Sequence, residues 1–587
     1  MRDERSRGLP APAAKPAQTG MREDRPPTVA QSLLECAARL GVEYVFTNLG
    51  SDHPAFIEAF ARLRERGATT PKAIVCPHEM TALSAAHGYA MIARRPQLVL
   101  VHVDVGTQNL GGSVHNAARG RVPALIVAGL SPLTAGTRVG ARNEFIHYIQ
   151  DTPRQHEIVG QYVKWAYELR APEMAEAVLL RAMQVASTPP EGPIYLTGAR
   201  EIWDARVPAA PESAADWPPS RLGGLPQEAL AELHGALVAA KRPIAITAYL
   251  GRQPQAVQRL AALSERIGIG VCEVSPEYLN FPGDHPHHLS YRRNALVDEA
   301  DLILMLDVDV PWIATKVQPA PDAQLFHVDV DALKQSLAFW HFPAQRSYQA
   351  DTLAVLEQLL EATPPSVPGR EARLDWIADA KRRQVSTPPS ADGPIGAEEL
   401  TEAVRGLVNE RTVILFEEPS GTELIPSMLR LQRPGSFFAS GGAGLGWGIN
   451  AAIGAKLARP DAEVISLVGD GSYLFGVPSS AYWVARTYGA PQLTVIYNNG
   501  GWHSPKLSTL WVHPEGSAKR NDTYWVTIGA GARLADIAAA AGDAEAFRVS
   551  ERQALKETLR QALHTVRGGR CAVVDVAIAP ISAQVLG

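Results

Sequence analysis

Residues 463–472 read EVISLVGDGS, and 26 residues separate the Gly469-Asp470-Gly471 turn from Asn498-Asn499 at the end of LTVIYNN (493–499). Both segments are continuous apolar runs that end in small polar residues, which is typical of buried parallel strands and the turns after them. Open α/β sheets bind ligands outside the carboxyl ends of their strands, so the two turns are expected to share a site. Carboxylate, amide and carbonyl oxygens suit Mg²⁺, and glycines let a phosphate approach the backbone. Either motif alone is explained as an ordinary turn, but the pair favours a site.

Similar apolar runs recur along the whole chain, with helical stretches such as AVQRLAALSERIG (256–268) between them. They are mostly continuous rather than alternating, which predicts parallel strands covered on both faces. The sequence therefore predicts an α/β protein with three doubly wound parallel sheets. The runs outside the two already quoted are VEYVFTN (42–48), AIVC (73–76), QLVLVHVDV (97–105), ALIVAGL (124–130), PIAITAYLG (243–251), DLILMLDVDV (301–310), QLFHVDV (324–330), TVILFEEP (412–419) and CAVVDVAIA (571–579).

Two Pro-rich segments, at 205–226 and 362–396, divide this pattern and indicate linkers. We expect an N-terminal domain over residues 27–205, a central domain over 222–362 and a C-terminal domain over 395–583. The segment before them, residues 1–26, is rich in Pro, Ala and charge, and is predicted to be a disordered tail.

Composition excludes several classes of protein. The 587 residues carry 56 Lys and Arg against 61 Asp and Glu, a formal net charge of −5, so the basic excess of a general nucleic-acid or membrane binder is missing. No apolar run approaches the roughly 18 residues of a transmembrane helix, and no secretory signal is recognisable. The four cysteines are scattered without a CxxC pair, which indicates neither a disulfide framework nor a zinc site. We expect a cytoplasmic protein without nucleic-acid or membrane partners.

A glycine-rich segment, SGGAGLGWGINAAIG (440–454), enters a predicted helix. It contains no GxGxxG register, which disfavours a nicotinamide-dependent oxidoreductase of the Rossmann type. Taken alone, it is explained as a tight helix entry with Leu445 in the core.

A third segment, CPHEMTALSAAHGYA (76–90), places Glu79 between a short strand and a helix. The helix dipole favours an acidic residue at this position, and for an isolated glutamate that explanation is sufficient.

Together the three segments resemble the signature of thiamine diphosphate-dependent enzymes of the acetolactate synthase, pyruvate decarboxylase and benzoylformate decarboxylase group, over nearly the whole chain from about residue 28. The resemblance implies pyrimidine-binding, central and diphosphate-binding domains in this order. It implies Asp470, Asn499 and the carbonyl oxygen of Gly501 as Mg²⁺ ligands, and Glu79 as the carboxyl group that binds the aminopyrimidine ring and activates the cofactor. The other residues that it places at the cofactor are Ser420, Thr422, Gly444, Leu445, Gly469, Gly471 and Ser472.

The resemblance to benzoylformate decarboxylase also implies residues at the substrate. Ser51 falls on a substrate-binding serine and His102 on a catalytic histidine, while His503 is a second candidate for proton transfer. His285, in FPGDHP, is a weaker candidate for a catalytic histidine, because a lone histidine is often structural. Asp104 and His503 replace small or apolar residues that the benzoylformate enzyme has near its substrate, which predicts a pocket more polar than one made for a phenyl ring.

The resemblance implies an enzyme that decarboxylates a 2-oxo acid, and then either releases an aldehyde or joins the remaining carbons to a second carbonyl. A 2-hydroxyacyl-CoA lyase or an oxalyl-CoA decarboxylase-like enzyme is an alternative. A nicotinamide-dependent oxidoreductase and a non-catalytic homologue are more remote ones. FAD is not expected in the central domain, since its arginine- and glycine-rich signals are absent, and a CoA-closing basic tail is also missing. In this family the glutamate and the diphosphate site come from different subunits, which implies a homodimer or homotetramer.

Overall fold

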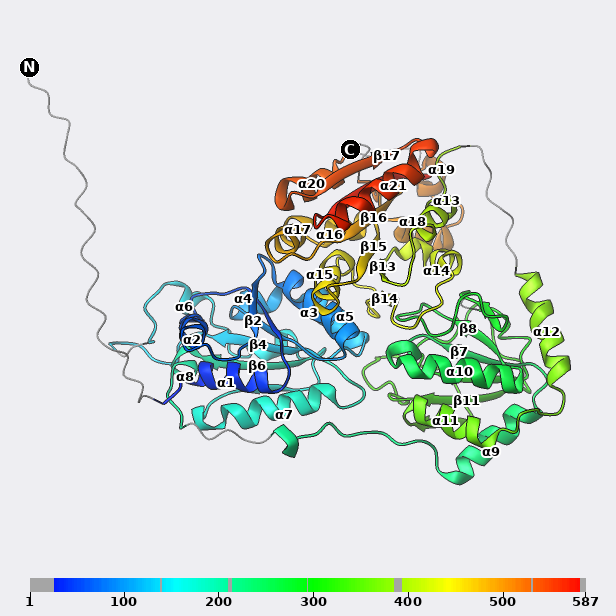
Figure 1. The fold of residues 1–587 in the computed structure, drawn as a ribbon, viewed down its shortest axis with the longest axis horizontal. Helices are drawn as coiled ribbons and strands as arrows, with labels where there is room; N and C mark the ends of the chain where they lie inside the picture. The colour runs from blue at the N-terminus through cyan, green and yellow to red at the C-terminus, as the bar shows by residue number, and fades with distance from the viewer. Residues whose placement is uncertain are drawn as a thin grey trace, which may run out of the picture.

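The computed structural model of the chain describes residues 26–137, 140–208, 214–292, 294–384, 393–528 and 531–580. The predicted tail therefore lies outside the described residues except for Pro26. Three parallel six-stranded sheets with flanking helices make up the molecule, as the sequence predicts. In Figure 1 the N-terminal domain lies at the lower left, the central domain at the lower right and the C-terminal domain above both. None of the described helices has both the length and the apolar character that crossing a membrane requires.

The N-terminal sheet has the strand order β2-β1-β3-β4-β6-β5. Its strands are β1 (Tyr44–Thr47), β2 (Lys72–Val75), β3 (Leu98–Val101), β4 (Leu125–Leu130), β5 (Ala166–Glu168) and β6 (Ile194–Ala199). Its helices are α1 (Val29–Arg39), α2 (Pro54–Glu65), α3 (Glu79–Ala93), α4 (Asp104–Gln108), α5 (Gly111–Arg119), α6 (Ile146–Ile149), α7 (Ala175–Ser187) and α8 (Arg200–Trp203).

The C-terminal sheet has the order β14-β13-β15-β16-β18-β17, which is the same path when it is counted from its own first strand. The sequence showed no repeat between these two domains. The strands are β13 (Thr412–Glu417), β14 (Phe437–Ala439), β15 (Glu463–Gly469), β16 (Leu493–Asn498), β17 (Glu545–Val549) and β18 (Ala572–Ala577). The helices are α13 (Ala397–Arg405), α14 (Leu424–Leu429), α15 (Gly448–Ala458), α16 (Asp470–Phe475), α17 (Pro478–Thr487), α18 (His503–Val512), α19 (Ser517–Asn521), α20 (Leu534–Gly542) and α21 (Arg552–Arg567).

The central sheet is wound differently, in the order β12-β11-β10-β7-β8-β9, so its chain path reverses between β7 and β10. Helix α12 lies beyond residue 362, yet its buried Arg373 donates to the carbonyl oxygens of Ile267 and Ala240 in this domain. The strands are β7 (Pro243–Thr247), β8 (Gly270–Glu273), β9 (His288–Ser290), β10 (Leu302–Leu306), β11 (Gln324–Asp329) and β12 (Arg346–Gln349). The helices are α9 (Gln227–Ala239), α10 (Pro254–Ile267), α11 (Thr352–Ala362) and α12 (Arg370–Arg383).

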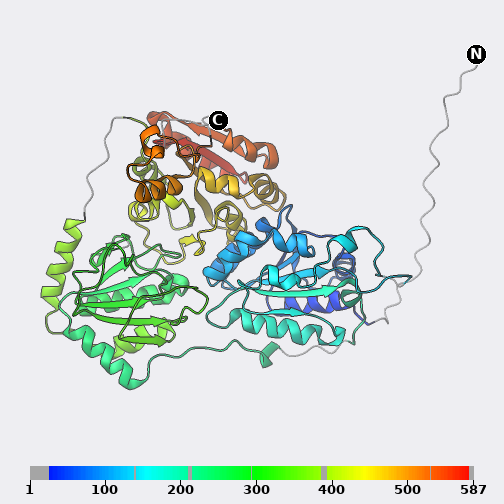
Figure 2. The same ribbon diagram turned by 180° about the vertical axis from the view of Figure 1, so that it is seen from behind.

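Helices α3 and α15 join the N-terminal and C-terminal domains by a close backbone contact (Figures 1 and 2). A Cβ atom added to Gly88 would lie 2.1 Å from the carbonyl oxygen of Ala451, and one added to Gly454 would lie 1.8 Å from that of Ala85. The glycines are therefore required here, because no side chain fits between the helices. Most residues of both helices are buried, so this contact fixes the two domains against each other.

Helix α5 and the turn after it contact both other domains. His115 and Asn116 hydrogen-bond to the glycine-rich turn at Gly442 and Gly444. Arg119 donates to the carbonyl oxygen of Ser336 at 2.8 Å in the central domain. Arg121, just past the helix, also reaches into the central domain.

Arg121 joins a buried group of charges at the carboxyl edge of the central sheet, next to the point where the chain path reverses. Its guanidinium lies 4.3 Å from the ring centre of Tyr249 and donates to both oxygens of Asp309. Lys334 is also buried and donates to Asp329 and to the Tyr249 hydroxyl. The crevice in which doubly wound sheets bind nucleotides is thus lined here by the chain's own paired charges.

Candidate active site

Glu79 is the first residue of α3 and lies at the carboxyl edge of the N-terminal sheet. Its side chain is buried, with 5% of its surface exposed. Asn48, which follows β1, donates to its Oε1 at 3.2 Å, and Asn109 donates to its Oε2 at 2.9 Å. Among the described residues no cation pairs with it. The N-terminus of α3 favours the carboxylate electrostatically, so Glu79 is held in place but keeps capacity for a further partner.

His102 follows β3 at the same edge and is bound on both ring nitrogens. Its Nδ1 lies 2.5 Å from Oδ1 of the buried Asp52, and its Nε2 lies 2.8 Å from Oε1 of Gln150. Burial alone lowers the pKa of His102, but the hydrogen bond to Asp52 and its charge, with the Gln150 contact, raise it above the ordinary value. Neither Asp52 nor Gln150 was predicted from the sequence.

Ser51 and Asp104 flank this histidine. Ser51 is exposed, and its Oγ lies 3.4 Å from Nε2 of His147 on α6. Asp104 begins α4, and its Oδ1 is buried without a hydrogen-bond partner among the described residues. A polar substrate pocket at this position stays a prediction.

Asp470 and Asn499 lie at the carboxyl edge of the C-terminal sheet, after β15 and β16. Asp470 is 2% exposed, and its Oδ2 has no hydrogen-bond partner among the described residues. Burial raises the pKa of Asp470 to about 6, against the opposing effect of the N–H groups of Gly471, Gly500 and Gly501. Asn498 instead turns away and donates to Asp575 at 2.8 Å. Asn499 is buried, and its Oδ1 accepts from the N–H of Gly501 at 3.2 Å.

The donor set fits a hard divalent cation. An orphaned carboxylate oxygen, an amide and the backbone at Gly501 are all oxygen donors. Gly501 has φ 153°, and a Cβ atom there would lie 2.0 Å from the carbonyl oxygen of Val526. The described residues contain no group of three His, Cys, Asp or Glu side chains placed for a metal, so this site depends on a single carboxylate.

The glycines of the Gly469-Asp470-Gly471 turn have different surroundings. Gly469 precedes α16, and the buried Ser472 lies within the first turn of that helix. A Cβ atom on Gly471 would lie 2.3 Å from Nε1 of Trp502. The indole of Trp502 thus packs on this turn, and its buried N–H has no hydrogen-bond partner among the described residues.

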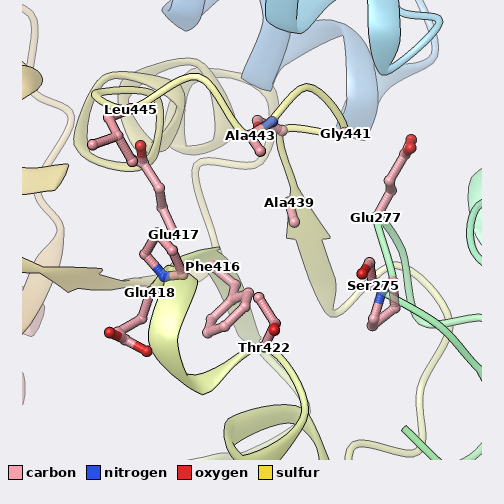
Figure 3. Close-up of a pocket in the computed structure, with 13 residues that line it drawn as sticks. Ser275, Glu277, Phe416, Glu417, Glu418, Thr422, Ala439, Gly441, Ala443 and Leu445 are labelled. Carbon is pink, nitrogen blue, oxygen red and sulfur yellow. The ribbon is translucent and has the colours of Figure 1, made fainter. Parts of the chain in front are cut away.

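A cavity of about 170 Å³ opens between the C-terminal and central domains (Figure 3). Leu445 and Thr422 line it together with Glu277 of the central domain. Ser420 lies beside it, exposed, in the turn after β13. Gly444 is fixed from outside the domain, because its N–H donates to Asn116 at 2.9 Å and its carbonyl oxygen accepts from the same amide at 2.8 Å.

Three glutamates that the sequence analysis missed also line this cavity. Burial raises the pKa of Glu277 to about 8, and those of Glu417 and Glu418 to about 7. Glu417 accepts the N–H groups of Gly446 and Gly448 at 2.5 and 2.6 Å, and Figure 3 shows it directed toward the turn of Leu445. For Glu417 and Glu418, the signal available in the sequence was a pair of acidic residues at the end of an apolar strand.

Of the remaining predicted histidines, His503 directly follows Trp502, which packs on the Gly471 turn, and His285 lies in the central domain. His503 is the first residue of α18, a helix with no buried residue, and burial and Lys506 lower its pKa. His285 lies 3.1 Å from Glu265 and packs on Phe281, both within the central domain. The structure thus gathers the predicted residues into two groups, around Glu79 and His102 and around Asp470 and Leu445. The described partners of Glu79 belong to its own domain.

Comparison with known proteins places this arrangement in context. Three family models match the chain in order: the thiamine pyrophosphate enzyme N-terminal TPP binding domain over residues 27–158, the central domain over 230–359, and the C-terminal TPP binding domain over 423–576. Benzoylformate decarboxylase of Pseudomonas aeruginosa is 27% identical over 489 residues, covering 81% of this chain and 86% of that one. The large subunit of acetolactate synthase isozyme 1 of Escherichia coli is 27% identical over 428 residues, covering 70% and 71%. A thiamine diphosphate-dependent 4-hydroxybenzoylformate decarboxylase of Rhodococcus jostii superposes with a TM-score of 0.77 at 21% identity, over 94% of this chain and 99% of that one.

Proposed function

Because this chain belongs to the thiamine pyrophosphate enzymes, in the decarboxylase and acetolactate synthase group, we propose that it uses thiamine diphosphate and Mg²⁺ to break or form a C–C bond at the carbonyl carbon of a 2-oxo acid. The predicted family, fold and enzyme class are confirmed. The observation that carries the proposal further is the buried carboxylate of Glu79, which is fixed by two side-chain amides at a helix start and pairs with no cation in the part of the chain that the structure describes.

Glu79 is suited to bind the aminopyrimidine ring of the cofactor. A carboxyl group that shares a proton with a ring nitrogen favours the imino form of the ring, which can accept the proton of the thiazolium carbon. Thiamine diphosphate, when bound, would supply that carbon as a nucleophile and its thiazolium ring as a sink for the electron pair that CO₂ leaves behind. Asn48 and Asn109 keep the carboxylate at a fixed position, which general acid–base chemistry requires.

Asp470, Asn499 and the Gly501 carbonyl would hold Mg²⁺, and the metal would anchor the diphosphate. The support is the orphaned Asp470 oxygen, since a buried carboxylate oxygen without a partner is costly unless a cation or a proton satisfies it. Gly469, Gly471 and Ser472 would lie along the diphosphate, and Leu445 and Thr422 along the thiazolium ring.

The group around Glu79 belongs to the N-terminal domain, and the group around Asp470 belongs to the C-terminal domain. We propose that a complete site forms between two copies of the chain. A test uses two inactive variants, Glu79→Gln and Asp470→Ala. If each site combines Glu79 of one chain with Asp470 of another, co-expression of the two variants gives hybrid dimers that contain one intact site. Random assortment then restores about a quarter of the native activity. Sites formed within single chains would give none.

The reaction is tested by incubating the enzyme, thiamine diphosphate and Mg²⁺ with a series of 2-oxo acids and measuring CO₂ and products. Glu79→Gln should retain cofactor binding by calorimetry while it loses most turnover, and Asp470→Ala should lose Mg²⁺-dependent binding. Full activity of Glu79→Gln, or unchanged affinity of Asp470→Ala, would refute the assigned roles. Acyl-CoA thioesters form a second series, and their cleavage would identify the 2-hydroxyacyl-CoA lyase alternative instead.

A further inference from the structure

The surroundings of Asp52 carry an inference about His102. The Asp52 side chain is 1% exposed, and both of its oxygens are engaged, Oδ1 by His102 at 2.5 Å and Oδ2 by the N–H of Val103 at 3.2 Å. A carboxylate buried to this degree needs a positive partner, or it becomes protonated. Among the described residues no Lys or Arg pairs with Asp52, and its ion-pair partners are the histidines 53 and 102.

His53 does not supply the charge. It is completely buried, and the N–H of Gly50 donates to its Nδ1 at 3.0 Å. The same Nδ1 lies 3.2 Å from Oδ1 of Asp52, and the Nε2 has no hydrogen-bond partner among the described residues. Burial lowers the pKa of this ring despite the opposing charge of Asp52, so the neutral form of the ring is favoured. His102 remains as the counterion of Asp52.

The second ring nitrogen of His102 faces an acceptor as well, Oε1 of Gln150 at 2.8 Å. A neutral imidazole has one N–H donor, whereas an imidazolium has two, and this ring is bracketed by two acceptors. Gln150 itself is located by the end of α6, where its carbonyl oxygen accepts from Ser131 at 2.8 Å.

Glycines shape the space for this pair. A Cβ atom on Gly50 would lie 2.0 Å from Nδ1 of His102, and one on Gly129, in β4, would lie 1.6 Å from Oδ2 of Asp52. The backbone therefore leaves room for the ring and the carboxylate at these two positions only because side chains are missing. The pair is built into the fold and is not a chance surface contact.

Other charged groups around the ring do not reverse this conclusion. Asp104 on α4 raises the pKa of His102, and Glu79 on α3 approaches the same glycine, Gly106, as the His102 side chain. The neighbouring cations, Arg142 and Arg200, contact His147 behind Ser51. Asp104 acts on the pKa of His102, whereas the two arginines hydrogen-bond to His147.

We propose that Asp52 and Gln150 are positioning residues that hold His102 as an imidazolium at neutral pH, so that it acts on the substrate through its positive charge and not as a base. The role rests on the proposed function, because an anionic 2-oxo acid is the ligand that such a cation would attract.

The test measures the protonation of His102 directly in the full-length protein. Diethyl pyrocarbonate reacts only with unprotonated imidazole, and peptide mass spectrometry reports its reaction at His102 as a function of pH. In the native protein the half-reaction pH should lie clearly above the ordinary 6.5. Asp52→Asn should lower it by about one to three pH units, and Gln150→Met should lower it by a smaller amount.

Asp151→Asn is the matched control, because Asp151 adjoins Gln150 but pairs with Arg142 instead, and this variant should leave the half-reaction pH unchanged. A His102 that titrates at or below pH 6.5 in the native protein overturns the proposal, and so does an unshifted Asp52→Asn. If circular dichroism shows that Asp52→Asn does not fold, Gln150→Met decides, and an unshifted value there overturns the proposal.

The pH profile of kcat/KM gives a second readout. Its fall at high pH should follow the His102 value and should move to lower pH in Asp52→Asn by the same amount. The labelling does not depend on turnover, so a failure of the 2-oxo acid assay with a confirmed His102 shift would refute the proposed function alone.

Discussion

The contact between α3 and α15 makes a quantitative prediction about Gly88→Ala. The added methyl carbon would lie 2.1 Å from the carbonyl oxygen of Ala451, and ordinary contact begins at 3.4 Å, so the backbones must separate by 3.4 − 2.1 = 1.3 Å or the helix must distort. The obstacle is backbone and not a flexible side chain, so local rotamer changes cannot relieve it. Overpacking of a tight core costs about 1–3 kcal/mol, and we expect the upper end, about 3 kcal/mol.

The assay is the thermal unfolding midpoint of the purified protein, which falls by about 2–4 °C for each kcal/mol lost in domains of this size. Gly88→Ala should therefore lower the midpoint by about 6–12 °C. Gly235→Ala is the matched control, because Gly235 lies within α9 with no atom near its added Cβ. Replacing this exposed helix glycine by alanine should stabilise the protein by about 0.5–1 kcal/mol. A Gly88→Ala protein as stable as the native one would refute the close approach of the two helices.

Two further predictions concern the interface between α3 and α15 and the glycine-rich turn at Gly444. His87 is completely buried against Trp447, and both of its ring nitrogens lack described partners. Burial lowers its pKa from 6.5 to about 3, so the folded protein should lose about 1.4 kcal/mol of stability for each pH unit as the pH falls below 6.5. His87→Phe should flatten this loss in urea unfolding midpoints between pH 6.5 and 4.5, and an unchanged slope would contradict the assignment. Asn116→Leu removes both hydrogen bonds to Gly444, at about 0.5–1.5 kcal/mol each, and should raise the half-saturating thiamine diphosphate concentration about tenfold while activity at saturation persists. Equal half-saturation in the variant and the native protein would show that Asn116 does not position the turn.

Most of the strands that were predicted lie inside their sheets. All eleven predicted apolar runs overlap a strand of the structure, and each of these strands except β2 is an interior parallel strand, which must be largely apolar. The buried interior strands β6 (IYLTGA) and β8 (GVCE) were nevertheless missed. Strands such as β5 (AYE) and β12 (RSYQ) were missed, because they lie at the edges of their sheets and are short and partly polar. The shared strand path of the first and third domains was also missed, because strand order leaves no direct mark on a sequence.

At the candidate site, local motifs were informative and long-range partners were not. Glu79, Asp470 and Asn499 follow predicted strands directly, so their position at a sheet edge could be inferred. Asp52 and Gln150 lie 50 and 48 residues from His102 in the chain, and no spacing rule connects them to it. The roles of all the predicted site residues, Ser51, Ser420 and His503 among them, remain predictions.

The position of α5 has a consequence for engineering. A chimera that takes its first domain from one relative and its third from another would combine an Asn116 and a Gly444 turn that were never selected together. If the central domain comes from the second relative as well, the exchange also separates Arg121 from Asp309. The Pro-rich linkers are the obvious recombination points, because they separate the domains. Recombination there should nevertheless often yield folded chains with poor cofactor retention. Exchanging residues 111–121 together with the third domain would preserve one of these contacts, and exchanging the central domain as well would preserve both.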